Sequence, residues 1–113
     1  MTKFLFITIN HGLTRPIKGK QFCNRAEDQE AIPGVFELLD REVADGFTII
    51  TLDNQGGVET GKSTIQIETE KVKFATQLFP QISMSMVFPS FERFKGEVLL
   101  LSQGQLPSSE KRA

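Results

Sequence analysis

The chain has 113 residues with 13 basic and 14 acidic side chains, which suits one compact domain with a formal charge of -1. Because the two signs are interspersed, the sequence indicates no surface for nucleic acid or for an anionic membrane. The lone Cys23 excludes an internal disulfide, and no Cys/His cluster has zinc-ligand spacing, so we expect a reducing, cytoplasmic setting.

The first segment in chain order is apolar. "KFLFITI", residues 3–9, is rich in aromatic and β-branched side chains and predicts a strand buried on both faces. It is too short to span a membrane and lacks the cleavage site of a signal peptide. Residues 10–31 contain Gly12, Pro16 and Gly19 without a sustained period, which predicts a long loop or a small flap over one end of the sheet.

A helix and a second strand follow. In "IPGVFELLDREVADG" the apolar residues recur at helical spacing, Pro33 suits the first helical position, and Gly46 suits the stop. "FTIITL", residues 47–52, predicts a short buried strand. Strand, helix and strand form a βαβ unit with parallel strands. We therefore expect the C-terminal ends of strands 3–9 and 47–52 to lie side by side.

The segment after the second strand predicts another helix and two more strands. Ser63 and Gln66 form a capping box, and an apolar stripe of helical period follows. Because "TIQIETE" alternates, a strand over residues 64–70 is the alternative. "ISMSMVF", residues 82–88, and "EVLLLS", residues 97–102, predict the remaining strands.

These elements predict an α/β fold in one domain over residues 1–102, followed by a flexible polar tail over residues 103–113. We expect strand 97–102 either to fold back beside strand 3–9 or to leave the edge of that strand to pair with another chain. The expected partners are therefore another protein or a second copy of this chain.

A phosphate-binding pattern lies behind the strand at 47–52. Gly56, Gly61, Lys62 and Ser63 match G-x-x-x-x-G-K-[ST], the P-loop, in which backbone N–H groups and the lysine hold phosphates. In a P-loop protein the strand runs straight into the first glycine, whereas here three residues intervene, and no later strand ends in an acidic Mg²⁺ partner. We interpret the match as chance and keep nucleotide binding through Lys62 and Ser63 as an alternative.

The two strand ends together point to another interpretation. "FLFITINHGLT" and "IITLDNQGGVETGK", with "IPGV" at the first helix and "LFPQI" before the third strand, resemble the haloacid dehalogenase-like (HAD-like) phosphatases. The resemblance is to the branch of polynucleotide 3′-phosphatases and histidinol- or heptose-phosphate phosphatases. It covers residues 3–95 and is most specific over 54–61. It implies a three-layer Rossmann-like partial core, with a short parallel sheet flanked by helices, and Mg²⁺-dependent phosphatase chemistry.

The positions that carry the family chemistry are changed in this sequence. The resemblance places Thr8 at the nucleophilic carboxylate, Asn10 at the acid/base carboxylate, and Asp53 at a hydroxyl residue that contacts phosphate. Threonine without a base is a poor nucleophile, asparagine cannot exchange a proton near neutral pH, and neither supplies the charge that holds Mg²⁺. We expect no catalytic residue, no metal ligand and no cofactor, with Mg²⁺ only if phosphatase activity persists.

The favoured hypothesis is a catalytically degenerate binding or interaction module. The alternatives are a phosphatase of a small phosphorylated metabolite or a nucleic-acid 3′ end, and nucleotide binding through "GGVETGKS". His11, the only histidine, lies beside Asn10 at the expected site, although strand-end and turn roles remain open for the residues around it. The expected ligand-binding residues are Thr8, Asn10, His11, Asp53, Asn54, Gln55, Gly56 and Lys62.

Overall fold

The computed structural model describes residues 3–21, 23, 25–89 and 99–102. The elements in chain order are β1 (Lys3–Ile7), β2 (Thr14–Pro16), the 3₁₀ helix η1 (Ala26–Asp28), β3 (Gln29–Ala31), α1 (Val35–Ala44), β4 (Phe47–Asn54), α2 (Gly56–Glu59), α3 (Ile65–Leu78), β5 (Ile82–Phe88) and β6 (Leu99–Ser102). The tail predicted over residues 103–113 lies outside the described residues, as do residues 97 and 98 of the last predicted strand.

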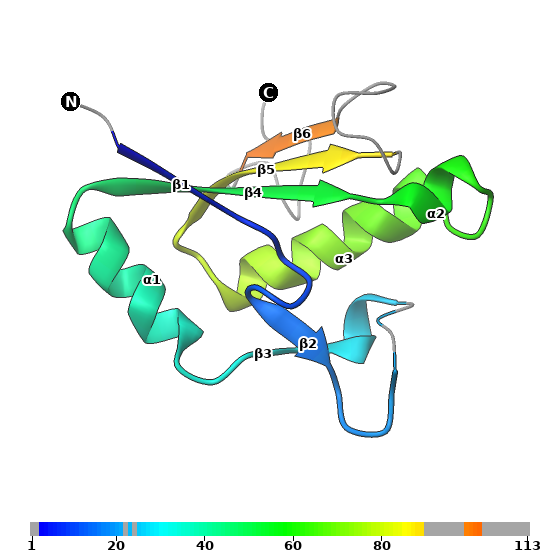
Figure 1. Ribbon diagram of the computed structural model, residues 1–113, viewed down its shortest axis with the longest axis horizontal. Helices are drawn as coiled ribbons and strands as arrows, with labels where there is room; N and C mark the ends of the chain where they lie inside the picture. The colour runs from blue at the N-terminus through cyan, green and yellow to red at the C-terminus, as the bar shows by residue number, and fades with distance from the viewer. Residues whose placement is uncertain (1–2, 22, 24, 90–98, 103–113) are drawn as a thin grey trace.

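Four strands form one sheet in the order β1-β4-β5-β6 (Figure 1). β1, β4 and β5 are parallel, whereas β6 runs antiparallel to β5. With helices connecting the parallel strands, the prediction of an α/β, Rossmann-like core with a short sheet flanked by helices is confirmed. The three layers that the resemblance implies are not all present among the described residues, because α1 and α3 lie on one face of the sheet. The prediction that residues 97–102 fold back beside β1 is wrong, because β6 pairs with β5. A strand beside the one that the chain has just left requires the shorter connection.

The core lies between the sheet and the two long helices. Figure 1 shows α1 and α3 on the same face of the sheet. The buried apolar cluster consists of Ile9, Leu13, Leu39, Ile49, Val72, Ala75, Phe79, Ile82 and Val87. α1 begins at Val35 rather than at Pro33, because Gly34 precedes it as an N-cap with a left-handed φ of 87°. Gly46, with a φ of 94°, follows the helix end as predicted.

α3 begins one residue after the predicted capping residue. Thr64 is the N-cap, and its hydroxyl oxygen accepts the backbone N–H of Ile67 at 3.1 Å. Ser63, the predicted cap, donates instead to the Glu68 carboxylate. The alternative strand over residues 64–70 is wrong, because the alternating stretch opens a helix whose later apolar stripe is buried against the sheet.

The segment between β1 and α1 forms a flap, which was one of its two predicted forms. β2 and β3 pair antiparallel, and Arg15 donates to Glu30 across the pair at 2.9 Å. η1 packs against α3. The side-chain N–H of Gln29 donates to the backbone carbonyl of Lys71 at 2.9 Å, which fastens the flap to α3.

The face of the sheet opposite α1 and α3 carries exposed apolar side chains. Phe4 and Phe6 of β1 are 51% and 54% exposed, so the prediction that this strand is buried on both faces is wrong. The apolar side chains continue onto the neighbouring strand, because Phe6 lies opposite Ile50 in β4. Further along, Leu52 lies opposite Met86, which in turn lies opposite Leu100 of β6. We call this surface the apolar sheet face; it consists of Phe4, Phe6, Ile50, Leu52, Met86 and Leu100.

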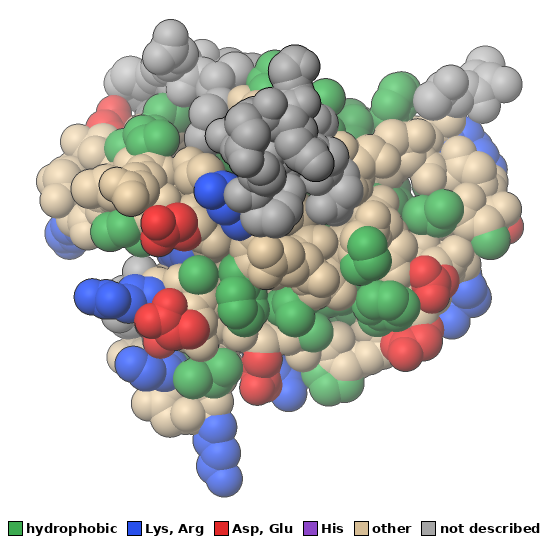
Figure 2. Space-filling view, turned by 180° about the vertical axis from the view of Figure 1, so that it is seen from behind, with side chains coloured by type: hydrophobic (Ala, Val, Ile, Leu, Met, Phe, Trp, Pro, Cys, Tyr) green, Lys and Arg blue, Asp and Glu red, His purple; other side chains and the backbone are tan. Residues whose placement is uncertain are grey.

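Charged side chains are spread over the surface. Figure 2, which shows the molecule from behind, has basic and acidic side chains interspersed with hydrophobic ones rather than gathered by sign. This agrees with the charge pattern of the sequence. In the part of the chain that the structure describes, no helix has both the length and the apolar character needed to cross a membrane.

Candidate functional site

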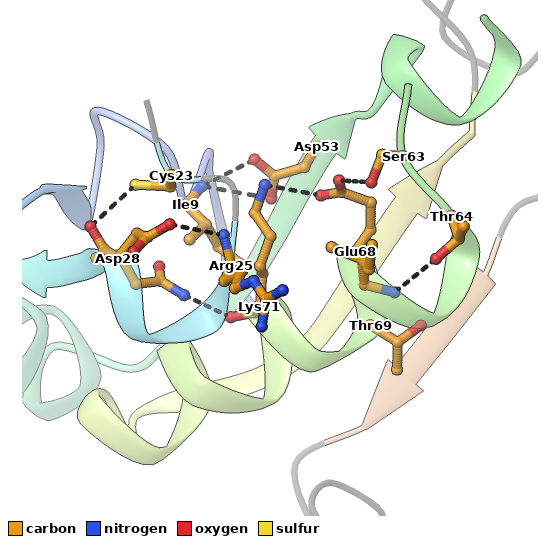
Figure 3. Close-up of polar contacts among 12 residues, drawn as sticks. Ile9, Cys23, Arg25, Asp28, Asp53, Ser63, Thr64, Glu68, Thr69 and Lys71 are labelled. Atoms are coloured by element: carbon orange, nitrogen blue, oxygen red, sulfur yellow. Dashed lines mark hydrogen bonds and ion pairs between the residues drawn. The ribbon is translucent and has the colours of Figure 1, made fainter. Parts of the chain in front are cut away.

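The C-terminal ends of β1 and β4 lie side by side, as predicted from the βαβ unit. The strands pair in parallel with Ile7 opposite Thr51, so the residues that follow them share one edge of the sheet. There the Asp53 carboxylate accepts the backbone N–H of Ile9, with Oδ1 at 3.1 Å and Oδ2 at 3.3 Å. Both residues are 6% exposed. Asp53 therefore ties the two strand ends together (Figure 3).

The turn after β1 contains three predicted ligand residues. Thr8 is exposed, and its hydroxyl donates to the backbone carbonyl of Asn10 at 3.3 Å. His11 has a positive φ of 64°, and its backbone N–H donates to the carbonyl of Thr14 at 2.7 Å. Gly12 allows the chain to close here, because a Cβ at this position would lie 2.3 Å from the carbonyl oxygen of Thr8. Backbone contacts within the turn therefore fix its shape.

A small cavity lies where the strand ends meet, and we call it the strand-end cavity. Its volume is about 10 Å³, which is room for about one water molecule. The lining residues are Ile9, Asn10, Gln29, Asp53, Gln55, Glu68, Lys71 and Val72. A phosphoryl group would not enter this space without displacement of the side chains around it.

The strand-end cavity brings together three of the eight predicted ligand residues, Asn10, Asp53 and Gln55. The backbone N–H of Gln55 donates to the carbonyl of Phe88 at 2.7 Å, which joins the end of β4 to the end of β5. The predicted residues outside its lining are Thr8, His11, Asn54, Gly56 and Lys62. Of these, the exposed Lys62 lies beside a different cavity.

Two charged residues of the strand-end cavity were not predicted from the sequence. Glu68 and Lys71 project from α3, with Lys71 Nζ 3.1 Å from Glu68 Oε1 and with side chains only 5% and 13% exposed. The contact is ionic, since Oε1 makes no hydrogen bond of good geometry. Ser63 donates its hydroxyl to Glu68 Oε2 at 2.5 Å. Figure 3 shows the Lys71 side chain directed toward the carboxylates of Asp53 and Glu68. An acid and a base at i, i+3 were the available signal, but this spacing usually indicates a surface pair.

A larger cavity, which we call the flap cavity, shares Glu68 and Lys71 with the strand-end cavity. Its volume is about 600 Å³, a size suited to a small molecule. The flap forms one wall, and α3 with the segment before it forms the other. The lining residues are Cys23, Arg25, Ala26, Glu27, Gly57, Lys62, Ser63, Ile67, Glu68, Glu70 and Lys71. Basic and acidic side chains are equally numerous among them, so the lining favours neither sign of ligand charge.

Cys23 lies in the flap wall of this cavity, and its thiol is 3.7 Å from the carbonyl oxygen of Asp28. Burial raises the pKa of the Cys23 thiol above its ordinary value of 9.0; the charge of Lys71 lowers the pKa by less, and Asp28 raises it further. The thiol therefore stays protonated at neutral pH and is a poor nucleophile.

The P-loop-like segment uses its N–H groups internally. Three of them donate to carbonyls of the same segment: those of Val58, Gly61 and Ser63 donate to Gln55, Val58 and Gly57, respectively. The segment also begins with the short helix α2 in place of an open loop. Because a P-loop holds phosphate with free backbone N–H groups, this geometry agrees with a chance match to the pattern.

The strand-end residues do not fit the Mg²⁺ that the HAD-like resemblance implies. Mg²⁺ requires near-octahedral oxygen ligands and usually keeps several waters, whereas the strand-end cavity has room for about one. Thr8 and Asn10 supply no carboxylate, and the Lys71 ammonium lies against Glu68. Among the residues that the structure describes, no cluster of three or more His, Cys, Asp or Glu could hold a metal ion.

No protein-family model and no curated protein matches the chain. Its fold is similar to that of a D,D-heptose 1.7-bisphosphate phosphatase from B. bronchiseptica, solved in complex with magnesium and phosphate, with a TM-score of 0.64 and 14% sequence identity. The alignment covers 84% of this chain and 54% of the phosphatase, so the chain spans about half the length of that protein. At this identity the similarity concerns the fold alone: the chain has an α/β fold similar to that of this phosphatase.

Proposed function

We propose that this chain is a HAD-like binding module that does not hydrolyse phosphate esters and that works through protein contacts. The buried hydrogen bond from the Ile9 N–H to the Asp53 carboxylate carries the proposal. This bond already uses the backbone N–H of Ile9, which is a donor at the junction of β1 and β4. A phosphate dianion at this junction would meet the carboxylate at close range and be repelled.

Among the residues that the structure describes around Asp53, none is a nucleophile with a base beside it. The Thr8 hydroxyl donates to a backbone carbonyl, which cannot take up its proton. Asn10 lines the cavity where an acid/base group would act, but its amide cannot exchange a proton near neutral pH. Hydrolysis at the strand ends therefore lacks both the attacking group and the proton carrier.

Hydrolysis of an aryl phosphate and of a panel of phosphorylated metabolites, with Mg²⁺ and with EDTA, tests the loss of activity. We expect no turnover by the wild type above that of a buffer blank. Thr8→Asp/Asn10→Asp restores the two family carboxylates, but we expect this variant to stay inactive while Asp53 is present. Wild-type turnover that disappears in Asn10→Ala or Asp53→Asn would refute the proposal.

The second candidate function is a phosphatase. It is favoured by the similarity in fold to an enzyme of that activity, solved with magnesium and phosphate. Mg²⁺-dependent turnover by the wild type would support it. Nucleotide binding through Lys62 and Ser63 has less support, since the Ser63 hydroxyl already donates to Glu68. It would require ATP binding that Lys62→Ala abolishes.

The apolar sheet face is the surface that we propose for protein contact, with a second copy of this chain as its occupant. A parallel sheet normally has both faces covered, whereas α1 and α3 lie on one face (Figure 1). From the exposed fractions of Phe4, Phe6 and Leu100, these three side chains offer on the order of 300 Å². Two copies stacked on it would bury on the order of 600 Å² through these side chains, which is the size of a weak, reversible contact.

Sedimentation velocity across a range of protein concentrations tests this contact. We expect a reversible dimer of the wild type that Phe6→Lys shifts to monomer. Val43→Lys is the matched control, because Val43 is also a half-exposed apolar residue, at 44%, but lies on α1. A wild type that stays monomeric at the highest concentration would refute self-association, and equal effects of the two variants would refute this face as the interface.

A further inference from the structure

The buried pair of Lys71 and Glu68 is held in place from two sides. The Gln29 side chain of the flap donates to the backbone carbonyl of Lys71 at 2.9 Å. On the other side, the Ser63 hydroxyl donates to the carboxylate oxygen of Glu68 that Lys71 does not contact. Exposed pairs at this helical spacing have no such supports. The Lys71 backbone and the Glu68 carboxylate are therefore held in place, and the ammonium lies against this carboxylate in the lining of both cavities.

That position places a positive charge among the oxygen atoms of the strand-end cavity. Its lining contains the carboxylates of Asp53 and Glu68 and the side-chain amides of Asn10, Gln29 and Gln55. Carboxylate and amide oxygens are the donors that bind Mg²⁺ and Mn²⁺. The Lys71 ammonium instead contacts Glu68 at 3.1 Å and is directed toward Asp53 (Figure 3).

We propose that the Lys71 ammonium is the resident cation of this site, in the role that a divalent metal has in metal-dependent proteins of similar fold. The lysine neutralises the Glu68 carboxylate, is directed toward Asp53, and excludes a divalent ion from the strand-end cavity by charge and by volume. The site is consequently independent of metal, and it becomes a metal site when the lysine is removed. This proposal deepens the proposed function, on which it rests for the absence of metal-dependent chemistry.

Removal of the lysine tests the exchange of one cation for another. Lys71→Ala opens space beside Asp53 and Glu68 and leaves Glu68 without its ion-pair partner. In EDTA we expect this variant to have a lower Tm than the wild type. MnCl2 or MgCl2 should raise its Tm progressively with concentration, because an ion that binds only the folded state stabilises that state. The Tm of the wild type should not respond to either salt.

Lys73→Ala is the matched control, because Lys73 lies on the same helix but does not line the strand-end cavity. It should show neither the loss in EDTA nor the response to Mn²⁺. NaCl at matched ionic strength separates specific binding from screening.

Three outcomes would overturn the proposal. The first is a wild type that binds Mn²⁺ or Mg²⁺ by calorimetry or gains Tm with them. The second is a folded Lys71→Ala without a metal response. The third is a Lys71→Ala that remains unfolded at saturating Mn²⁺, since the ion should replace the ammonium. Phosphate-ester hydrolysis by the wild type in EDTA would refute the proposed function and leave the role of Lys71 intact, so the two failures are distinguishable.

Discussion

Replacement of Asp53 by alanine should lower the free energy of unfolding, because it removes the acceptor of a buried N–H. Ile9 and Asp53 are each 6% exposed, and the two N···O distances are 3.1 and 3.3 Å. A hydrogen bond to a charged group contributes about 1.5–3 kcal/mol, and a buried donor without a partner costs about 1–3 kcal/mol. The alanine variant no longer has to bury a charged carboxylate when it folds, and this offsets part of the loss. We therefore expect Asp53→Ala to lower the free energy of unfolding by about 2 kcal/mol. Asp53→Asn keeps an acceptor for Ile9 and should cost about 1 kcal/mol.

Thermal unfolding followed by circular dichroism measures both variants. For a domain of this size the Tm should fall by about 10 °C for alanine and by about 5 °C for asparagine. Asp45→Ala is the control, because Asp45 is the exposed C-cap residue of α1, and the Tm should move by about 2 °C or less. An alanine variant as stable as the wild type would refute the structural role of Asp53. It would indicate a carboxylate that is kept for a ligand and that contributes nothing to folding.

The sheet, the first turn and the flap each provide a further prediction. Thr51 donates its hydroxyl to Ser85 at 2.6 Å, and both side chains are fully buried. A double-mutant cycle of Thr51→Val and Ser85→Ala, measured by urea unfolding, should therefore give a coupling free energy of about 1 kcal/mol. Additive effects of the two substitutions would contradict this prediction. Gly12→Ala should lower stability by about 2 kcal/mol or more in the same assay, because its Cβ would meet the carbonyl oxygen of Thr8, and an unchanged midpoint would show that the turn can shift. Because the pKa of Cys23 is raised in the folded state, its contribution to stability should be complete below pH 9.0 and be lost as pH rises through the higher folded pKa. Alkylation by iodoacetamide near neutral pH should accordingly be slower than for an unfolded peptide, and equal rates would contradict the raised pKa.

Local patterns predicted the succession of elements but not the neighbour of the last strand. "KFLFITI", "FTIITL" and "ISMSMVF" are short apolar runs bounded by turn residues, and each overlaps a strand of the sheet, although β4 extends beyond its run to Asn54. The place of Asp53 at a shared sheet edge was predicted as well, because parallel strands end on the same side. "EVLLLS" has the same pattern whether it pairs with β1 or with β5. The choice depends on the path of the chain, which periodicity does not describe.

Glu68 and Lys71 could not be recognised from the sequence for a different reason. Helical periodicity assigns the polar residues of α3 to solvent, and an acid and a base at i, i+3 fit that assignment. Their burial depends on the flap, which packs on α3 through η1 and through Gln29, 42 positions away from Lys71. Contacts between residues so far apart in the chain cannot be read from a local sequence pattern. The volume of the strand-end cavity, which these contacts help to close, cannot be read from it either.

β1 joins the sheet along one side only within the described residues, through five residue pairs with β4. The same strand carries Ile9 to Asp53 on one side of the molecule and presents Phe4 and Phe6 on the other. Local opening of β1 would therefore separate Ile9 from Asp53 and break up the apolar sheet face in one event, while β4 and β5 remain paired. Hydrogen exchange at the amides of Lys3–Ile7 consequently reports on both surfaces, and a molecule bound at either one should slow exchange along this strand first.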